Sequence, residues 1–547
     1  MEKWNLAALG FAVLCCILWL LRGKQKDLSR QALPKKTEYL LLGLFILLAL
    51  GVRLWRFGSV PGGFNQDGAM AAVDAKALAD YGTDRYGMRL PAHFTAWGYG
   101  QMSVLMSYCM APLIRLFGLN TVTARLPSLL WSLVGLACVY GFSRRAFGPR
   151  AALVLFAFAA LDPWHITQSR WALDCNLYPH VFLLGLWLLL MGAEGKKWAL
   201  YLSMPVFGLC MYCYGVSVYT LPPFLLAACA WLLVTKRVKW GQAFLCAALY
   251  LLIAWPFLLT MAVNAFGWET ISLPFVTIPY FPGSVRAGDI LLFSDDIPRQ
   301  LWANIRTTVQ VVFLQKRDLT WNEVPGFGTI YRFSLPFALL GMARAWKRRR
   351  TPGGALLLLF FGAGLLCGVL TNSVNVNRIN LIFYPMILFT GLGLELLLSR
   401  LRYVRYGVIA LYLAAFLCFT ATYFGSYTER IAVSFMSDFG SAVASVKDTD
   451  AEKLYITADS QFTGAWHVSE ILTLFWHETD ARYYQGYTQE GEIPFREKYV
   501  FASMKDLTID PSENAVYVLK QSDRGLFDAE RFTFEDFGAY CVAAPKG

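Results

Sequence analysis

"GGFNQDGAMAAVDAKALADYGTDRYGMRLPAHFTAWGYG", residues 62–100, is a polar interruption in an otherwise apolar N-terminal third and follows directly after an apolar run. It carries four carboxylates, those of Asp67, Asp74, Asp80 and Asp84. The chain of 547 residues is 56% hydrophobic and 16% charged. Soluble domains are about one quarter charged. Repeated apolar runs of spanning length therefore predict a polytopic α-helical membrane protein rather than a β-barrel.

The apolar runs and the basic clusters between them predict the topology. Apolar runs lie near residues 4–22, 39–55, 99–118, 123–143, 150–162, 177–193, 198–214, 218–234, 242–263, 330–346, 353–371, 379–398 and 404–424. Basic clusters lie at 22–36, 144–150, 196–197, 236–239, 344–350 and 400–405. Placing every cluster in the cytoplasm gives a consistent alternation only if the run 99–118 does not cross fully. This run is a poor span, because it contains Gly, Gln and Ser residues and Pro112. We expect that run to lie at the outer surface or to dip into it, which leaves about twelve full spans among 12–13 transmembrane helices, with both chain ends outside.

The composition changes sharply after residue 425. Residues 1–425 are expected to form the membrane domain, with long outer loops at 56–98 and 264–329; the second loop is rich in aromatic and turn-forming residues, which is typical of a lid. The tail contains strand-like runs (KLYITA from residue 453, AVYVLKQ from residue 515) and a helix-like run (FMSDFGSAVASVK from residue 435). Residues 426–547 therefore predict a small extracytoplasmic α/β domain.

Several classes of function are disfavoured. The net charge of +12 comes from short clusters between apolar runs, which is the positive-inside pattern of a membrane protein and not a nucleic-acid surface. Most of the twelve cysteines lie in or beside apolar runs without paired CxxC spacing, so free buried thiols are expected. The sequence has no Walker loop, no GxGxxG before a helix, no HExxH and no GxSxG.

Asp67 is the first candidate for chemistry. It lies about a dozen residues beyond the end of a predicted span, where a carboxylate can face a partly dry cleft and act as a general base. The spacing around Asp67 and Asp74 suggests a short helix lying along the membrane. The alternative is that these carboxylates are solvated loop residues, an interpretation that fits Asp80 and Asp84.

The segment LDPWHITQSRWALDCNLYPH, residues 161–180, supplies further candidates on the outer side. Arg170 and His165 lie at the membrane edge, where phosphate headgroups are found. Arg170, His165 and Asp174 are therefore candidates for substrate binding. The alternatives are that Arg170 only snorkels to the interface and that Asp174 is its structural ion-pair partner.

A third outer segment, TNSVNVNRINLIFYP (residues 371–385), places Arg378 at the start of a span, where a cation suits the phosphate of a lipid carrier or simple headgroup anchoring. Tyr212, Tyr214 and Tyr219 cluster at another outer turn, where they fit either sugar stacking or an aromatic belt.

Taken in order, four segments resemble the GT-C glycosyltransferases, near the bacterial protein-mannosyltransferase and aminoarabinose-transferase group. They are QDGAMAAVDAKALADYGTDRYGMRLPAHF, FGLNTVTARLPSLLWSLVGLACVYGFSRRAFG, LDPWHITQSRWALDCNLYPHVFLLGLWLLL and NRINLIFYPMILF. The resemblance covers most of residues 39–425. The C-terminal region has no recognisable signature.

The resemblance implies that Asp67 is the catalytic residue and that the donor is a sugar linked to a polyprenyl phosphate or diphosphate. Many relatives have a second acidic residue and a Lys-Pro pair where this chain has WGYGQMS. Trp97, Tyr99 and Gln101 occupy that segment and are expected to contact the substrate. Because the lysine is absent, phosphate binding is expected to depend on Arg170 and Arg378.

The expected function is therefore inverting transfer of a sugar on the outer face of the cytoplasmic membrane, to a protein, lipid or cell-wall glycan acceptor. A nucleotide-sugar donor does not fit an outer site without nucleotide motifs. No cofactor is required by the pattern; a divalent metal is compatible with it, but a single carboxylate supplies too few ligands to assign one. The alternatives are a transporter or flippase of lipid-linked sugars, which should show intramembrane charges or paired broken helices, and a scaffold that presents the tail domain.

Overall fold

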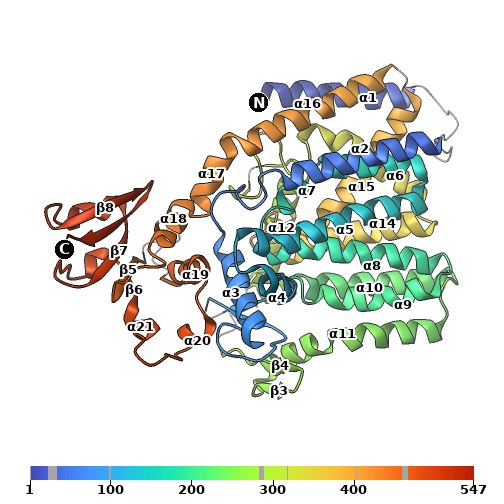
Figure 1. The fold of residues 1–547 in the computed structure, drawn as a ribbon. Coiled ribbons are helices and arrows are strands. Elements are labelled where there is room, and N and C mark those ends of the chain that lie inside the picture. The colour runs from blue at the N-terminus through green and yellow to red at the C-terminus, as the bar shows by residue number, and fades with distance from the viewer. Residues whose placement is uncertain are drawn as a thin grey trace.

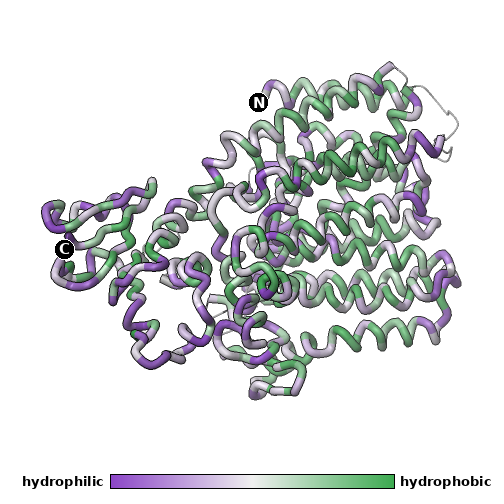
Figure 2. The backbone as a smooth tube through the Cα atoms, viewed as in Figure 1, coloured by the Kyte–Doolittle hydropathy of each residue, from purple (hydrophilic) through white to green (hydrophobic). Residues whose placement is uncertain are grey.

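The computed structural model describes residues 2–21, 34–97, 100–282, 289–316, 318–401, 403–458 and 466–546. Its core is a bundle of roughly aligned helices with apolar surfaces (Figures 1 and 2). Nine helices in these ranges are long and apolar enough to cross a membrane, two of them counted together with a preceding 3₁₀ turn. They are α1 (Glu2–Leu21), α2 (Lys35–Leu54), α5 (Thr121–Phe147), α8 (Leu177–Ala193), α10 (Ser217–Val234), α11 (Trp240–Phe266), α14 (Pro352–Leu370), α15 (Phe383–Arg400) and α16 (Val404–Phe424). The predicted polytopic helical class is confirmed.

Three of the expected spans form shorter helices within the same bundle, namely α6 (Pro149–Leu161), α9 (Lys197–Cys210) and α13 (Leu335–Lys347). At 1.5 Å per residue, helices of 13 or 14 residues are about 20 Å long, less than the roughly 30 Å of a bilayer core. Local chemistry ends α6 early, because Asp162 leaves the helix and its side chain caps the next helix, α7 (Pro163–Gln168). Hydropathy alone therefore overstated the number of full-length spans.

The run at 99–118 does not form a spanning helix, as expected. It begins in a hairpin of β1 (Phe94–Ala96) and β2 (Gly100–Met102) and continues into the 13-residue helix α4 (Leu105–Phe117). Helix α4 packs on α3 (Gln66–Tyr81), which is the predicted helix around Asp67. Most residues of α3 are buried between α4 and the C-terminal helix α19 (Trp466–Trp476), and the expectation that α3 lies along the membrane stays a prediction.

The loop at 264–329, expected to be a lid, has structure of its own. It contains the hairpin β3 (Ile271–Leu273) and β4 (Val276–Ile278), followed by η4 (Leu291–Phe293) and the amphipathic helix α12 (Ile297–Val312), which packs on α14. Thr277 exchanges backbone hydrogen bonds with Leu90 and Ala92, at 3.1 and 2.8 Å. The two outer loops predicted from sequence therefore form one continuous structure.

The tail folds into a mixed five-stranded sheet, in the order β6-β5-β7-β9-β8, with helices on one side. The predicted strands and helix are confirmed as β5, β7 and α18. The elements are α17 (Ser426–Ser434), α18 (Ser437–Ser445), β5 (Lys453–Thr457), α19, α20 (Ala481–Tyr484), α21 (Phe495–Lys498), β6 (Tyr499–Ala502), η7 (Met504–Asp506), β7 (Ala515–Lys520), η8 (Gln521–Leu526), β8 (Phe532–Phe537) and β9 (Tyr540–Pro545). Alternate residues of β7 face opposite sides: Val518 joins the main core, while Tyr517 and Leu519 pack in a second apolar cluster.

Figure 1 shows the start of α1, helices α3 and α4, and the C-terminal sheet at the same end of the bundle. We call this the sheet end. All twelve cysteines are free thiols, as expected. Cys541 is fully buried in the sheet.

Candidate active site

Asp67 lies in the first turn of α3, at the sheet end. The side chain of Asn65 caps this helix by accepting hydrogen bonds from the backbone N–H groups of Asp67 and Gly68, at 2.9 and 3.3 Å. A carboxylate in this first turn is favoured by the helix dipole. Position 68 requires glycine, because a Cβ atom there would lie 2.5 Å from the carbonyl oxygen of Ala172. The close approach brings Asp67 against the 161–180 segment.

A cavity of about 110 Å³, the Asp67 cavity, lies where five segments of the chain meet. It is lined by Asp67, Met70, Met102, Leu173, Asp174, Cys175, Tyr214 and Asn377. Three residues predicted from sequence, Asp67, Asp174 and Tyr214, therefore meet at one site. Asp67 and Tyr214 are half-buried, and Asp174 is buried. Two carboxylates, a hydroxyl and an amide can hold and deprotonate a hydroxyl-bearing substrate.

The donors of this cavity are oxygen-rich, which is the set that hard divalent cations use. Within the part of the chain that the structure describes, no group of three or more His, Cys, Asp or Glu side chains converges as a metal site. We therefore assign no step to a metal.

Arg170 does not reach this cavity. Its side chain is fully buried and donates to the backbone carbonyl oxygens of Val52, Arg53, Trp55, Arg56 and Val60. The rings of Phe57, Tyr423 and Phe424 lie within 6 Å of its guanidinium. The carbonyl groups at the end of α2 lack helical partners, and Arg170 satisfies them. Arg170 is therefore bonded to backbone groups and does not snorkel to the interface, and its role as a phosphate ligand stays a prediction.

His165 is also buried away from the cavity. Its Nδ1 atom lies 2.8 Å from Nη2 of Arg53, and its Nε2 atom lies 3.0 Å from the hydroxyl of Tyr384, which also contacts His180. Burial, with the neighbouring Arg53 guanidinium, lowers the pKa of His165 well below its usual value, so the imidazole is neutral. The cap at Asp162 turns α7 so that His165 points into the bundle. His165 therefore does not line the Asp67 cavity, and its role in substrate binding stays a prediction.

Arg378 lies next to the cavity-lining Asn377. Its guanidinium is one quarter exposed and donates to the carbonyl oxygen of Asn372 at 2.6 Å and to Oδ2 of Asp289 at 3.1 Å. A guanidinium has five N–H donors, and these contacts use two. Arg378 stays a prediction as a phosphate ligand.

The segment 97–103 lies beside both Asp67 and the C-terminal helices. Met102 lines the Asp67 cavity, and the half-buried Gln101 precedes it in β2, opposite Thr95. Trp97 is half-buried at the turn of the β1–β2 hairpin, with a left-handed φ of 51°. Tyr99 lies outside the described residues.

The remaining carboxylates of the first outer loop differ in environment. Asp80 is partly exposed and pairs with Lys76, as expected of a solvated residue. Asp84 is buried and accepts backbone hydrogen bonds from Tyr86 and Met88, so its interpretation as solvated is wrong. Asp74 is buried against Arg85 at 2.6 Å, and burial raises the pKa of Asp74 to about 7 against the opposing effect of that guanidinium.

Sequence reasoning missed a second cavity, of about 450 Å³, which shares Met70 with the Asp67 cavity. Its lining includes Arg85, Trp97, His467, Glu470, Tyr484 and Arg496. Four of these six residues lie in the C-terminal region, more than 350 positions away in the sequence, where no motif marked them. The adjacent Asp84 and Arg85 in the first outer loop were the one local sign of a charged site.

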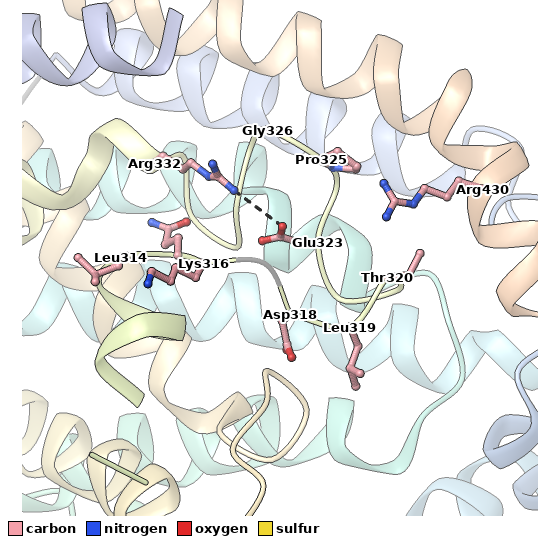
Figure 3. A pocket seen from close by; sticks show the side chains of 11 residues that line it. Leu314, Lys316, Asp318, Leu319, Thr320, Glu323, Pro325, Gly326, Arg332 and Arg430 are labelled. Carbon is pink, nitrogen blue, oxygen red and sulfur yellow. Dashed lines mark ion pairs between the residues drawn. The ribbon is translucent and has the colours of Figure 1, made fainter. Parts of the chain in front are cut away.

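A third cavity, of about 490 Å³, lies in the loop between α12 and η5 (Arg332–Ser334). Figure 3 shows Arg332 directed toward Glu323, at 3.8 Å. At the edge of this cavity, Asp318 accepts a hydrogen bond from the backbone of Val376 at 2.6 Å. The loop that lines the third cavity therefore holds the segment that carries Asn377 and Arg378.

Comparison with known proteins identifies the architecture. The structure is similar to crystal structures of ArnT from Cupriavidus metallidurans. The apo form has a TM-score of 0.57 at 16% sequence identity and covers 93% of this chain and 98% of ArnT. The form bound to undecaprenyl phosphate has a TM-score of 0.58 at 15% identity and covers 92% and 97%. The chain has the GT-C fold.

Residues 102–259 of this GT-C chain match the sequence model of the dolichyl-phosphate-mannose-protein mannosyltransferase family. The matched range contains Met102, Asp174 and Tyr214 of the Asp67 cavity and begins after Asp67 itself. No curated protein matches the chain in sequence. The comparisons therefore confirm the fold that the sequence resemblance implied. The family match does not include Asp67, so the proposed role of Asp67 rests on the geometry of the site.

Proposed function

We propose that this protein is a membrane glycosyltransferase that moves a sugar from a polyprenyl-phosphate-linked donor to an acceptor on the outer face of the cytoplasmic membrane. The carrying observation is the Asp67 cavity, which combines two carboxylates with a hydroxyl and an amide at the sheet end of the bundle. Binding of undecaprenyl phosphate to ArnT, which shares the fold, supports a polyprenyl phosphate as the carrier.

The reaction follows from the groups in the cavity. Asp67 accepts the proton of the acceptor hydroxyl as its oxygen bonds to the anomeric carbon. The bond between that carbon and the phosphate oxygen breaks in the same step, so the configuration inverts and polyprenyl phosphate leaves with the bonding electron pair. Asp174 and Asn377 are placed to hold sugar hydroxyls.

Charge develops on the leaving phosphate, and a cation beside it lowers the barrier. Because Arg170 is fully engaged with backbone carbonyls, we assign this role to Arg378, whose neighbour Asn377 lines the cavity. The basic clusters support an outer position for the sheet end, where the donor would be lipid-linked because nucleotide sugars are absent there.

The test is the release of polyprenyl phosphate by the purified protein from a panel of polyprenyl-phosphate sugars. Asp67→Asn keeps the size of the side chain and removes the proton acceptor, so the rate should fall about 10²–10⁴-fold while donor binding persists. Asp80→Asn is the matched control, because Asp80 is a partly exposed carboxylate on the same helix.

A folded Asp67→Asn protein with full turnover at saturating donor and acceptor would disprove the mechanism. Movement of the intact lipid-linked sugar between leaflets, without its cleavage, would favour the transporter alternative.

A further inference from the structure

The second cavity has two walls that come from distant parts of the chain. Met70 of α3 and the segment from Arg85 to Trp97 form one wall. Helix α19, helix α20 and the side chain of Arg496 form the other. Its volume of about 450 Å³ lies within the range of small-molecule sites.

Specific contacts hold the two walls together at both ends of α3. At its start, the ring of Phe64 stacks on Phe475 with centroids 4.2 Å apart. At its end, the hydroxyl of Tyr81 donates to Asp480 at 2.6 Å, and Gln485 donates to the carbonyl oxygen of Asp84 at 3.1 Å. The cavity is therefore preformed and not a gap between loosely associated domains.

The charges around the second cavity are paired. Arg85 is bound by Asp74 and by the carbonyl oxygen of Thr95, and Arg496 contacts Glu470 at 2.7 Å. Burial lowers the pKa of His467, so the imidazole is neutral near pH 7 and offers one donor and one acceptor. A pocket with donors and acceptors but balanced charge suits a ligand with many hydroxyl groups and no net charge.

Aromatic rings supply the apolar part of the same lining. Trp97, Tyr86 and Tyr484 border the cavity. Trp97 adopts a left-handed φ of 51°, which a bulky residue adopts only where its surroundings impose it, and such strain clusters at functional sites. Rings of this kind cover the apolar faces of sugars, while their polar edges hydrogen-bond.

The second cavity lies next to the Asp67 cavity. Met70 lines both, and it follows Asp67 by three positions on the same face of α3. Methionine is flexible and polarizable, so the side chain that the two cavities share can change its conformation.

We propose that the second cavity binds the acceptor, that the acceptor is an uncharged saccharide, and that the C-terminal domain is therefore part of the active site. This inference rests on the proposed function, because Asp67 acts on a hydroxyl of the saccharide bound there. A peptide is usually recognised along a strand edge or an apolar groove. The described lining residues come instead from helices and turns.

The test is saturation-transfer NMR on the full-length protein in detergent, with neutral tetrasaccharides of N-acetylglucosamine, glucose and mannose and a serine-rich hexapeptide as probes. At least one tetrasaccharide should bind. Glu470→Gln breaks a charged contact in the lining and should lower that affinity about tenfold or more. Tyr484→Phe removes only one hydroxyl and should lower it less.

Glu478→Gln is the matched control, because Glu478 forms a similar ion pair with Lys447, just beyond α19 and outside the lining. Binding of no tetrasaccharide, binding of the hexapeptide in their place, or equal losses in the Glu470 and Glu478 variants would each overturn the inference.

Asp67→Asn separates the two proposals. It should still bind the tetrasaccharide, because Asn keeps a hydrogen-bonding group at this position, although its release of polyprenyl phosphate falls about 10²–10⁴-fold. Donor cleavage that depends on Asp67 without saccharide binding would refute only the acceptor inference. Saccharide binding by a protein that cleaves no donor would refute only the proposed function.

Discussion

Arg170→Gln is expected to destabilise the fold and not to weaken donor binding selectively. The guanidinium is fully buried and contacts five carbonyl oxygens between residues 52 and 60. A hydrogen bond to a charged group contributes about 1.5–3 kcal/mol, but these five share four N–H groups and are not additive. Breaking a buried charged network typically costs about 3–5 kcal/mol, which is the loss we expect.

This loss corresponds to about a 10²–10⁴-fold change in the unfolding equilibrium. The assay is thermal unfolding of detergent-solubilised protein, paired with donor kinetics on the fraction that remains folded. Arg378→Gln is the contrasting variant. Because Arg378 is partly exposed and makes two contacts, its loss should cost at most about 1 kcal/mol of stability while raising the donor KM.

An Arg170→Gln protein with wild-type thermal stability and a raised donor KM would refute this argument and restore Arg170 as a phosphate ligand. Unchanged donor kinetics in Arg378→Gln would remove the last predicted cation from the site.

Two further predictions concern the C-terminal domain. His477 is buried between the hydroxyl of Tyr499 and the carbonyl oxygen of Val443, and burial lowers the pKa of His477. As the pH falls, the unfolded chain therefore binds a proton at this histidine before the folded chain does. The stability of the fold should fall as the pH drops through the ordinary histidine range near 6.5. Thermal unfolding at pH 7.5 and 5.5 should show this loss reduced in His477→Gln, and an equal loss in both proteins would contradict it. The membrane topology can be tested with the exposed cysteine of Glu535→Cys, because the native Cys541 is buried. An impermeant thiol reagent should label the Glu535→Cys protein on intact cells. The Lys197→Cys protein should react only after lysis. The reverse pattern would invert the orientation.

The features that could be predicted from sequence are those that depend on local composition. Span length and hydropathy are properties of one segment, so the helical class and most of the bundle followed from them. The alternation in the β7 strand and the helical spacing of α18 are equally local. The three short helices were overcounted because hydropathy does not detect where a cap such as Asp162 ends a helix.

The positions of Arg170 and His165 away from the Asp67 cavity have a common cause. A cation beside a span is compatible with a phosphate ligand, but its partner depends on which polar groups lack hydrogen bonds in the folded chain. For Arg170 these groups are carbonyls at the end of α2, more than 100 residues earlier. No local pattern in the 161–180 segment shows that need.

Asp67 could be proposed from a local signal in the sequence, whereas the composition of α3 explains why the residues around it could not. The helix contains alanines at 69, 71, 72, 75, 77 and 79, all buried. Small side chains let both α4 and α19 pack closely on α3, and Met70 faces a cavity whose opposite wall includes α19. The sequence of an alanine-rich helix does not predict which other elements pack against it. The same small residues allow the C-terminal helix α19 to pack closely on α3, so the geometry around Asp67 and Met70 depends on the docking of the C-terminal domain.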